Sequence, residues 1–191
     1  EDKSALGRDG LAALAARHET LAQKHQAGKP LIAVTVPPLA GRSWSQGQTL
    51  IDIVSDDRPF LVDSIASEMA RQGRTIQMLI HPIMDHLSHI HMVLQGTTTP
   101  EGQKSLHGGL ETVLRDVKAA TGDWEAMRKA LLHAQEVLKK TPARLTTPED
   151  IAEGCDFLSY LYQDNFTLLG YAYYNGKGQI SGESRGLLDA L

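Results

Sequence analysis

A strand that runs directly into a helix constrains the fold of this chain more than any other feature. The segment Thr49–Val54 is a run of β-forming residues whose side chains alternate between two faces, with Asp52 among the apolar ones. Pro59 has a fixed φ and no N–H, so it fits the first turn of a helix, where an N–H would have no intrahelical partner. Apolar residues at helical spacing follow until Gly73, which is predicted to end the helix. The sequence therefore predicts a buried strand, a short junction and an amphipathic helix in immediate succession.

Two more strands and a second helix are predicted after this pair. The strands lie at 76–84 and 90–94, and a helical apolar face covers 106–114. Residues 115–120 fit either a continuation of that helix or a final strand. The segment 49–121 thus has the βαββαβ order of a ferredoxin-like α+β domain. Such a sheet has one face covered by helices and one open face, and we expect the open face to pair with a neighbour.

The beginning of the chain is predicted as a flanking region. Residues 1–48 contain an amphipathic helix, in which Leu14 and His18 share the apolar face, then a β-rich segment at 31–36 and a loop at 41–47. We place this region ahead of the α+β domain.

The end of the chain is predicted to open a second α/β unit. Residues 122–146 contain a helix, with Asp123 as its N-cap, and a linker. Residues 147–191 begin with a capped helix and continue into a hairpin, whose turn is marked by Asn175-Gly176. The first and last residues also lead us to expect that the chain is part of a longer protein.

Composition excludes several classes of function. The chain has 191 residues, of which 41% are apolar, and a net charge of −4 without a basic cluster, so nucleic acid is not an expected partner. No apolar run approaches the ~20 residues of a membrane span, so we expect no membrane partner. A single cysteine, Cys155, forms no internal disulfide, which indicates a reducing compartment, and we expect the cytoplasm.

Histidines are concentrated in one part of the chain. His81, His86, His89 and His91 lie within one short segment, and His89 and His91 would share one face of a strand. No carboxylate or thiol sits beside them at strand spacing, so we interpret them as a polar sheet face or an interface and predict no metal ligand. No motif of a hydrolase, a metalloprotease or a nucleotide-binding loop is present. We therefore predict no catalytic residue and no residue that binds a cofactor.

The strand-to-helix junction is the best candidate for a binding site. Free N–H groups at a helix N-terminus favour an anion such as a carboxylate. Arg58 lies in this junction, and a guanidinium binds carboxylates well. The alternative is that Asp57 only caps a turn.

Several ordered motifs resemble a known family. They are Asp56-Asp57-Arg58-Pro59-Phe60-Leu61-Val62-Asp63-Ser64, Ile80-His81-Pro82-Ile83, Ser88-His-Ile-His-Met92, Asp123-Trp124-Glu-Ala-Met127 and Asp164-Asn-Phe-Thr-Leu-Leu-Gly-Tyr171. Together with smaller matches they cover most of residues 30–175, and they resemble the N-terminal region of the large bacterial NAD-specific glutamate dehydrogenases.

The resemblance implies an ACT-type module ahead of a distant catalytic core. The parent enzyme would oxidatively deaminate L-glutamate to 2-oxoglutarate and ammonia with NAD, whereas this region would be non-catalytic and regulatory or oligomerising. By analogy with ACT modules, the effector site would be Asp57, Arg58, Pro59 and Phe60, with an amino acid as effector. Phe60 stands where ligand-binding versions prefer glycine.

The expected partners follow from the same resemblance. They are other domains of the same chain and further copies of it, which would pair through the sheet. One alternative is a purely structural interaction module without a ligand. Another is a small metal-dependent enzyme that uses the histidines.

Overall fold

The computed structural model describes residues 3–37, 47–142 and 144–189. Most of the loop predicted at 41–47 lies outside these residues. Contacts divide the chain into two compact units, Glu1–Val117 and Lys118–Leu191. Each unit is described by itself.

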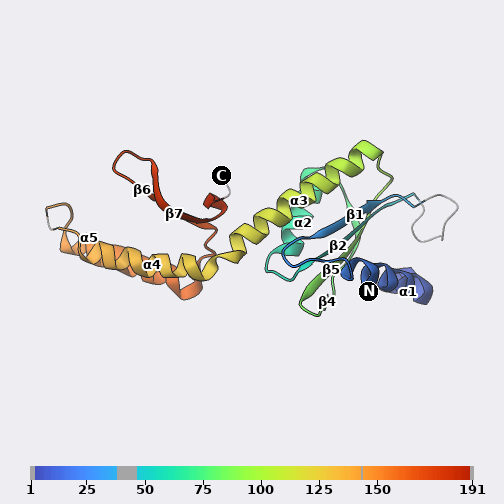
Figure 1. Ribbon diagram of the computed structural model, residues 1–191, viewed down its shortest axis with the longest axis horizontal. Helices are drawn as coiled ribbons and strands as arrows, with labels where there is room; N and C mark the ends of the chain where they lie inside the picture. The colour runs from blue at the N-terminus through green and yellow to red at the C-terminus, as the bar shows by residue number, and fades with distance from the viewer. Residues whose placement is uncertain (1–2, 38–46, 143, 190–191) are drawn as a thin grey trace. The chain divides into compact units, whose positions relative to one another are not determined.

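The first unit is built on an antiparallel sheet. Its strands are β1 (Leu31–Thr35), β2 (Thr49–Asp56), β3 (Ile76–Ile80) and β5 (Leu87–Leu94). They lie in the order β1-β2-β5-β3, and the two-residue strand β4 (Ile83–Met84) also pairs with β5 (Figure 1). The two central strands are almost entirely buried. Their alternation sends one set of side chains to each face of the sheet.

Two helices cover one face of this sheet. They are α2 (Leu61–Arg71) and α3 (Pro100–Gly122), and their apolar sides meet the inward side chains of β2 and β5. The buried cluster between them consists of Ile51, Ile53, Leu61, Ile65, Met69, Ile90, Met92, Leu94, Leu106, Leu110, Leu114 and Val117. This is the main hydrophobic core of the unit.

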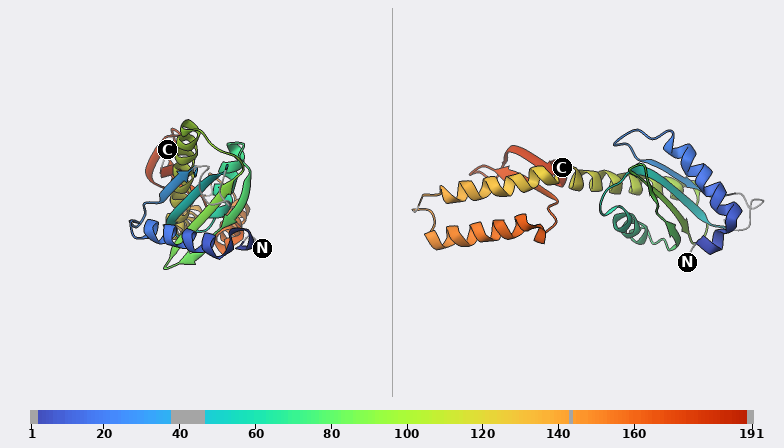
Figure 2. Two further views of the ribbon diagram at one scale, coloured as in Figure 1. Left: turned by 90° about the vertical axis from the view of Figure 1, so that its right-hand side faces the viewer. Right: turned by 90° about the horizontal axis from the view of Figure 1, so that it is seen from below.

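The helix α1 (Lys3–Ala22) lies on the opposite face of the sheet. Figure 2 shows the strands between α1 and α2 in its right-hand view. Leu14 of α1 packs with Leu50, Met78 and Val93 of the sheet in a second, smaller buried cluster. The face that we expect to be open to a neighbour is therefore partly covered by a helix of the same chain.

The α+β, ACT-like fold is confirmed, and the structure settles its last element. Residues 115–120 continue α3 rather than form a strand, because Leu114 and Val117 stay on the buried side of the helix. The sheet position beside β2 is taken by β1, which pairs with β2 over five residue pairs. The N-terminal strand thus supplies the edge that a C-terminal strand supplies in the βαββαβ order.

The second unit consists of two helices and a hairpin. The helices are α4 (Trp124–Lys139) and α5 (Pro148–Tyr160), which continues into a π-helical turn (Leu161–Asn165). The hairpin is formed by β6 (Gly170–Tyr174) and β7 (Ile180–Gly186), and a 3-10 turn (Leu187–Asp189) follows it.

Local signals in this unit are confirmed with one difference. Thr147 caps α5 in a reciprocal pair with Asp150, and Asn175 accepts backbone hydrogen bonds that close the hairpin turn. Asp123 occupies the N-cap position of α4, but its side chain does not cap the helix and instead accepts a hydrogen bond from Gly186 N. Asp123 is therefore the N-cap residue as predicted, but its carboxylate binds the hairpin instead of the N–H groups of the helix.

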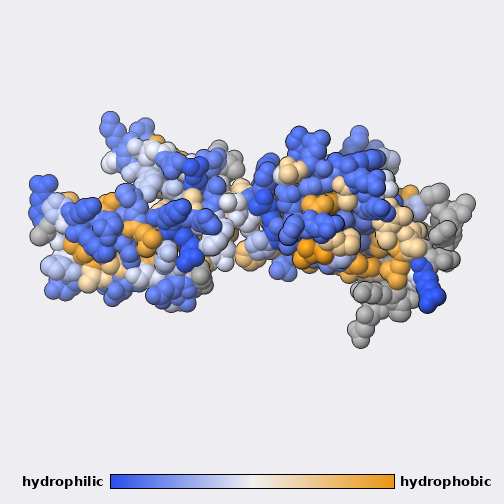
Figure 3. Space-filling model, turned by 60° about the horizontal axis from the view of Figure 1, so that its bottom comes forward, coloured by the Kyte–Doolittle hydropathy of each residue, from blue (hydrophilic) through white to orange (hydrophobic). Residues whose placement is uncertain are grey.

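The second unit buries little of its apolar surface. No residue of α5 is fully buried, and Phe157 and Phe166 are 58% and 61% exposed. Figure 3 shows apolar residues on the surface of both units. Our division of the chain at residues 48/49, 121/122 and 146/147 stays a prediction, although β1 joins the sheet of the first unit.

Candidate functional site

The predicted junction between β2 and α2 lies at the surface of the first unit. Asp57 donates its backbone N–H to His86 O at 3.0 Å, and its Oδ1 accepts a hydrogen bond from Ser88 Oγ at 2.6 Å. His81 Nε2 lies 2.9 Å from the same hydroxyl. The Asp57 carboxylate is thus held by neighbouring strands, and it fixes the junction against β5.

Arg58 points its guanidinium toward the acidic end of β2. Its Nη2 lies 3.8 Å from Asp56 Oδ2, and the side chain keeps a quarter of its surface, 26%, exposed. Asp56 Oδ2 also accepts a hydrogen bond from Gly28 N at 2.8 Å. A ligand that binds Arg58 therefore competes with a weak, partly solvated ion pair.

Phe60 is the N-cap of α2 and adopts a left-handed conformation. Its φ is 68°, which is unusual for a residue with a bulky side chain. Within the described residues, no side chain caps the first turn of α2, although Asp63 in that turn interacts favourably with the helix dipole. Pro59 and Phe60 are exposed. The four predicted residues therefore form a continuous loop at the surface.

A second group of polar residues is buried between α1 and the sheet. We call Asp52, His18, His89 and His91 the histidine–aspartate cluster. Asp52 Oδ1 lies 2.6 Å from His91 Nδ1 and 3.1 Å from His18 Nε2. Arg17 Nε lies 2.5 Å from the other carboxylate oxygen, Oδ2. One buried carboxylate thus joins α1 to two strands of the sheet.

The sheet register creates this cluster. Asp52 of β2 is directly opposite His91 of β5. His89 precedes His91 by two residues, so it lies on the same face of the sheet. His18 comes from the apolar side of α1, which lies over this face. The rings of His18 and His89 lie 5.6 Å apart between their centroids, and those of His18 and His91 lie 6.2 Å apart.

Electrostatics keep the Asp52 carboxylate charged. Burial raises its pKa, but the hydrogen bonds with His18 and His91 and the charge of Arg17 outweigh burial, so the net pKa lies far below its usual range. Burial also lowers the pKa of His89, and the nearby His18 lowers it further. His89 therefore favours the neutral imidazole.

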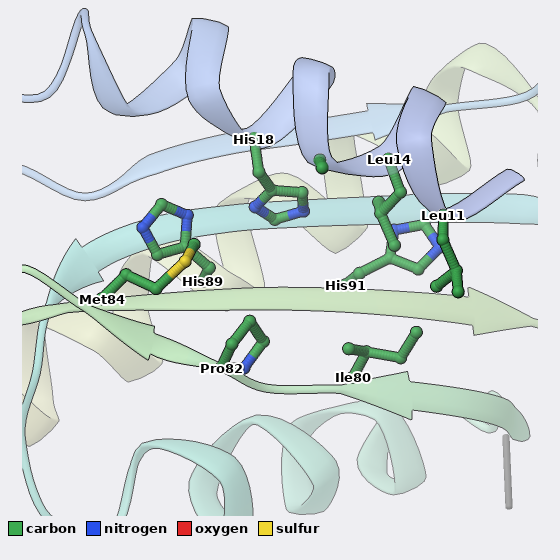
Figure 4. A pocket seen from close by; sticks show the side chains of 9 residues that line it. Leu11, Leu14, His18, Ile80, Pro82, Met84, His89 and His91 are labelled. Atoms are coloured by element: carbon green, nitrogen blue, oxygen red, sulfur yellow. The ribbon is translucent and has the colours of Figure 1, made fainter. Parts of the chain in front are cut away.

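A cavity of about 210 Å³ lies beside the cluster. Figure 4 shows the rings of His18, His89 and His91 between α1 and the sheet, together with the apolar side chains around them. The lining residues are Leu11, Leu14, Ala15, His18, Ile80, Pro82, Met84, His89 and His91. Imidazole nitrogens are its main polar groups.

Sequence reasoning found parts of this cluster without joining them. Strand alternation predicts that His89 and His91 share a face, but no carboxylate lies at strand spacing beside them in the sequence. Asp52 is 39 residues from His91, and His18 is 34 residues from Asp52. The usable signal was Asp52 itself, a charged residue inside an apolar strand.

Comparison with known proteins agrees with this architecture. The model of the family described as "Glutamate dehydrogenase, ACT1 domain" matches residues 1–129, which include the whole sheet, α1, α2 and α3. The chain belongs to this family. The match thus confirms the relationship to glutamate dehydrogenases that the sequence motifs indicate.

Two curated relatives of this ACT1 chain carry the same name. "NAD-specific glutamate dehydrogenase" of Halomonas elongata is 31% identical over 76% of this chain and 10% of its own length. The protein of that name from Pseudomonas aeruginosa is 23% identical over 85% of this chain and 11% of its own length. The ACT1 chain thus spans about a tenth of the length of these relatives. Among its described residues, no helix is long and apolar enough to cross a membrane.

Proposed function

We propose that this chain is a non-catalytic regulatory or assembly region of an NAD-dependent glutamate dehydrogenase. The family match over residues 1–129 supports this proposal, as do the names of both relatives. NAD and the conversion of L-glutamate to 2-oxoglutarate would belong to the rest of the enzyme. The region would respond to an amino-acid effector, assemble with other domains and copies, or do both.

The observation that carries the regulatory role is the geometry of the β2–α2 junction. Arg58 is partly exposed and precedes α2 by three residues, and no side chain among the described residues caps the first turn of this helix. A guanidinium and a helix N-terminus both attract a carboxylate. The effector site would comprise Asp57, Arg58, Pro59 and Phe60, with Asp57 holding the loop to Ser88.

Calorimetric titration of the chain with each amino acid tests this function. For an amino acid that binds, we expect Arg58→Ala to weaken affinity by about 1.5 to 3 kcal/mol, the usual contribution of a charged hydrogen bond, or roughly 10- to 150-fold. Arg115→Ala is the matched control, because Arg115 is an exposed arginine of α3 that pairs with Asp116. Unchanged affinity in the Arg58 variant would move the effector site elsewhere.

A purely structural module is the second candidate. The exposed apolar side chains of the second unit, such as Phe157 and Phe166, favour it because such residues are common where proteins dock. If no amino acid produces heat or a thermal shift, the structural role replaces the regulatory one.

A further inference from the structure

The histidine–aspartate cluster contains the ligand types that zinc prefers. One ligand atom each from His18, Asp52 and His91 lie within 4.8 Å of one another, and all three residues are buried. Imidazole nitrogen and carboxylate oxygen suit Zn²⁺ and related first-row divalent ions. His89 adds a third imidazole beside His18. The set therefore provides three ligands, with another imidazole nearby.

Regular secondary structure holds these side chains. Asp52 and His91 face each other in adjacent central strands, and each is at most 2% exposed. His18 is on α1, which Leu14 anchors to the sheet one turn earlier. Ligands on rigid elements are positioned more accurately than ligands on loops.

Two ring nitrogens of the cluster have no hydrogen-bond partner in the part of the chain that the structure describes. They are Nδ1 of His18 and Nδ1 of His89, on side chains that are only 5% and 4% exposed. Buried polar groups are nearly always hydrogen-bonded, and an ion or a water is one explanation for an exception. Of these two atoms, only Nδ1 of His89 could bind a metal at this site, because His18 faces Asp52 through Nε2.

The separations of the ligand atoms are close to those around a metal. Zinc lies about 2.0 to 2.2 Å from nitrogen and oxygen ligands, which places tetrahedral ligand atoms roughly 3.3 Å apart. Asp52 Oδ1 is 3.1 Å from His18 Nε2 and 2.6 Å from His91 Nδ1, and all three ligand atoms lie within 4.8 Å of one another, so small side-chain movements would bring them to these separations. The ring protons would shift to the other nitrogens, and the metal would replace the two hydrogen bonds.

Arg17 determines how the carboxylate would bind. Because its Nε pairs with Asp52 Oδ2, only Oδ1 remains for a metal. Carboxylates that bind metals are commonly held by a hydrogen-bonding residue that does not itself touch the metal. The fourth position would face the cavity, where His89 or a water would complete a tetrahedron.

We propose that His18, Asp52 and His91 form a divalent metal site of the zinc class, with His89 next to its fourth position. The metal would fasten α1 to the sheet, since one ligand comes from the helix and two come from the strands. This inference is independent of the proposed regulatory function.

Metal titration of the purified chain tests the site. The chain is freed of metal and titrated with Zn²⁺ in competition with a coloured chelator, and Co²⁺ is added separately for its visible absorption. We expect one tight equivalent, a tetrahedral Co²⁺ spectrum and a higher Tm with Zn²⁺, because an ion that binds only the folded state stabilises it. His91→Ala and Asp52→Asn should each weaken Zn²⁺ binding at least about 100-fold. Loss of a residue that only hydrogen-bonds to a ligand already costs up to about 100-fold, and these variants remove the ligand itself.

Two further variants make the outcome decisive. His107→Ala is the control, because His107 is an exposed histidine of α3 that pairs with Glu111, and it should bind metal like the unaltered chain. His18→Ala removes the ligand on α1 and leaves the sheet intact. This variant therefore tests the site even if a strand variant fails to fold. Absence of a tight equivalent, or equal affinity in the His18 and His107 variants, would overturn the proposal and leave a hydrogen-bonded network.

Discussion

Two adjacent glycines in α3 have different roles at the scale of single residues. Glycine in a helix interior costs about 1 kcal/mol relative to alanine, so sequence alone treats Gly108 and Gly109 alike. In the structure, a Cβ on Gly108 meets nothing within 4 Å, whereas one on Gly109 would clash with the ends of the side chains of Glu68, in α2, and Gln72, its C-cap. Gly109 therefore allows the two helices to approach closely.

Alanine substitutions should separate the two glycines. Gly108→Ala should raise the free energy of unfolding by up to about 1 kcal/mol, through helix propensity. Gly109→Ala should give no such gain, because Glu68 must leave its hydrogen bond with Gln72, which contributes about 1 kcal/mol. Denaturant unfolding of both variants measures the difference, and equal gains would contradict the close packing of α2 on α3.

The ion pair between Glu68 and Arg71 makes the stability of the fold depend on pH. Arg71 donates hydrogen bonds to the Glu68 carboxylate at 2.6 and 2.7 Å, and these bonds lower the pKa of Glu68 below its ordinary value of 4.5. A carboxylate with a lowered pKa stabilises the fold above its unfolded pKa and loses this stabilisation as the pH falls through the folded pKa.

Acid unfolding should therefore depend on Glu68. We expect Glu68→Gln to reduce stability at pH 7 and to have less effect as the pH falls from the ordinary pKa of 4.5 through the lowered pKa of the folded protein, where the unaltered side chain becomes protonated. The effect should be small, because Arg71 is 70% exposed and the pair is screened by solvent. Unfolding curves at several pH values measure it. A constant difference between the two proteins at all pH values would refute the assignment.

At the scale of elements, periodicity predicted the helix α2 and its buried face. Ile65 is 0% exposed and lies in the main core with Met69 and Leu106. The start of the helix was predicted near Pro59, but Pro59 does not lie in the first turn as expected, because the helix begins at Leu61 with Phe60 as its N-cap. The left-handed Phe60 was not predicted, since nothing in the local pattern requires positive φ at a bulky residue.

Truncation of Ile65 tests the helix face. Ile65→Ala should lower the free energy of unfolding by about 2 to 5 kcal/mol, because it removes buried methyl groups and leaves a cavity. Ile83→Ala is the matched control, since Ile83 of β4 is 56% exposed and should change stability by less than about 0.5 kcal/mol. Equal denaturant midpoints for both variants would mean that Ile65 does not support the core.

Elements that depend on distant partners were harder to predict. Residues 115–120 suited a helix or a strand, and the choice followed from β1, which already occupies the sheet edge beside β2. Asp123 was a reasonable N-cap by sequence, yet Gly186 of the hairpin supplies its actual donor. In both cases a residue far along the chain decided between local alternatives.

At the scale of the whole molecule, the sequence by itself determined most of the elements and the family. Strand alternation, helical spacing and turn residues act over a few neighbours, so they can be read from β2 to β5 without a structure. The same local motifs identified the ACT1 relationship, which the match over residues 1–129 confirmed.

Only the tertiary structure decided which faces meet. Periodicity shows that a helix has an apolar side, but it does not show which surface that side will cover. The packing of α1 on the sheet brings His18 to Asp52 and His91 and creates the cluster where we propose a metal. Burial is a property of the assembled chain, so groups separated by more than thirty residues became one site only when the sheet and helix came together.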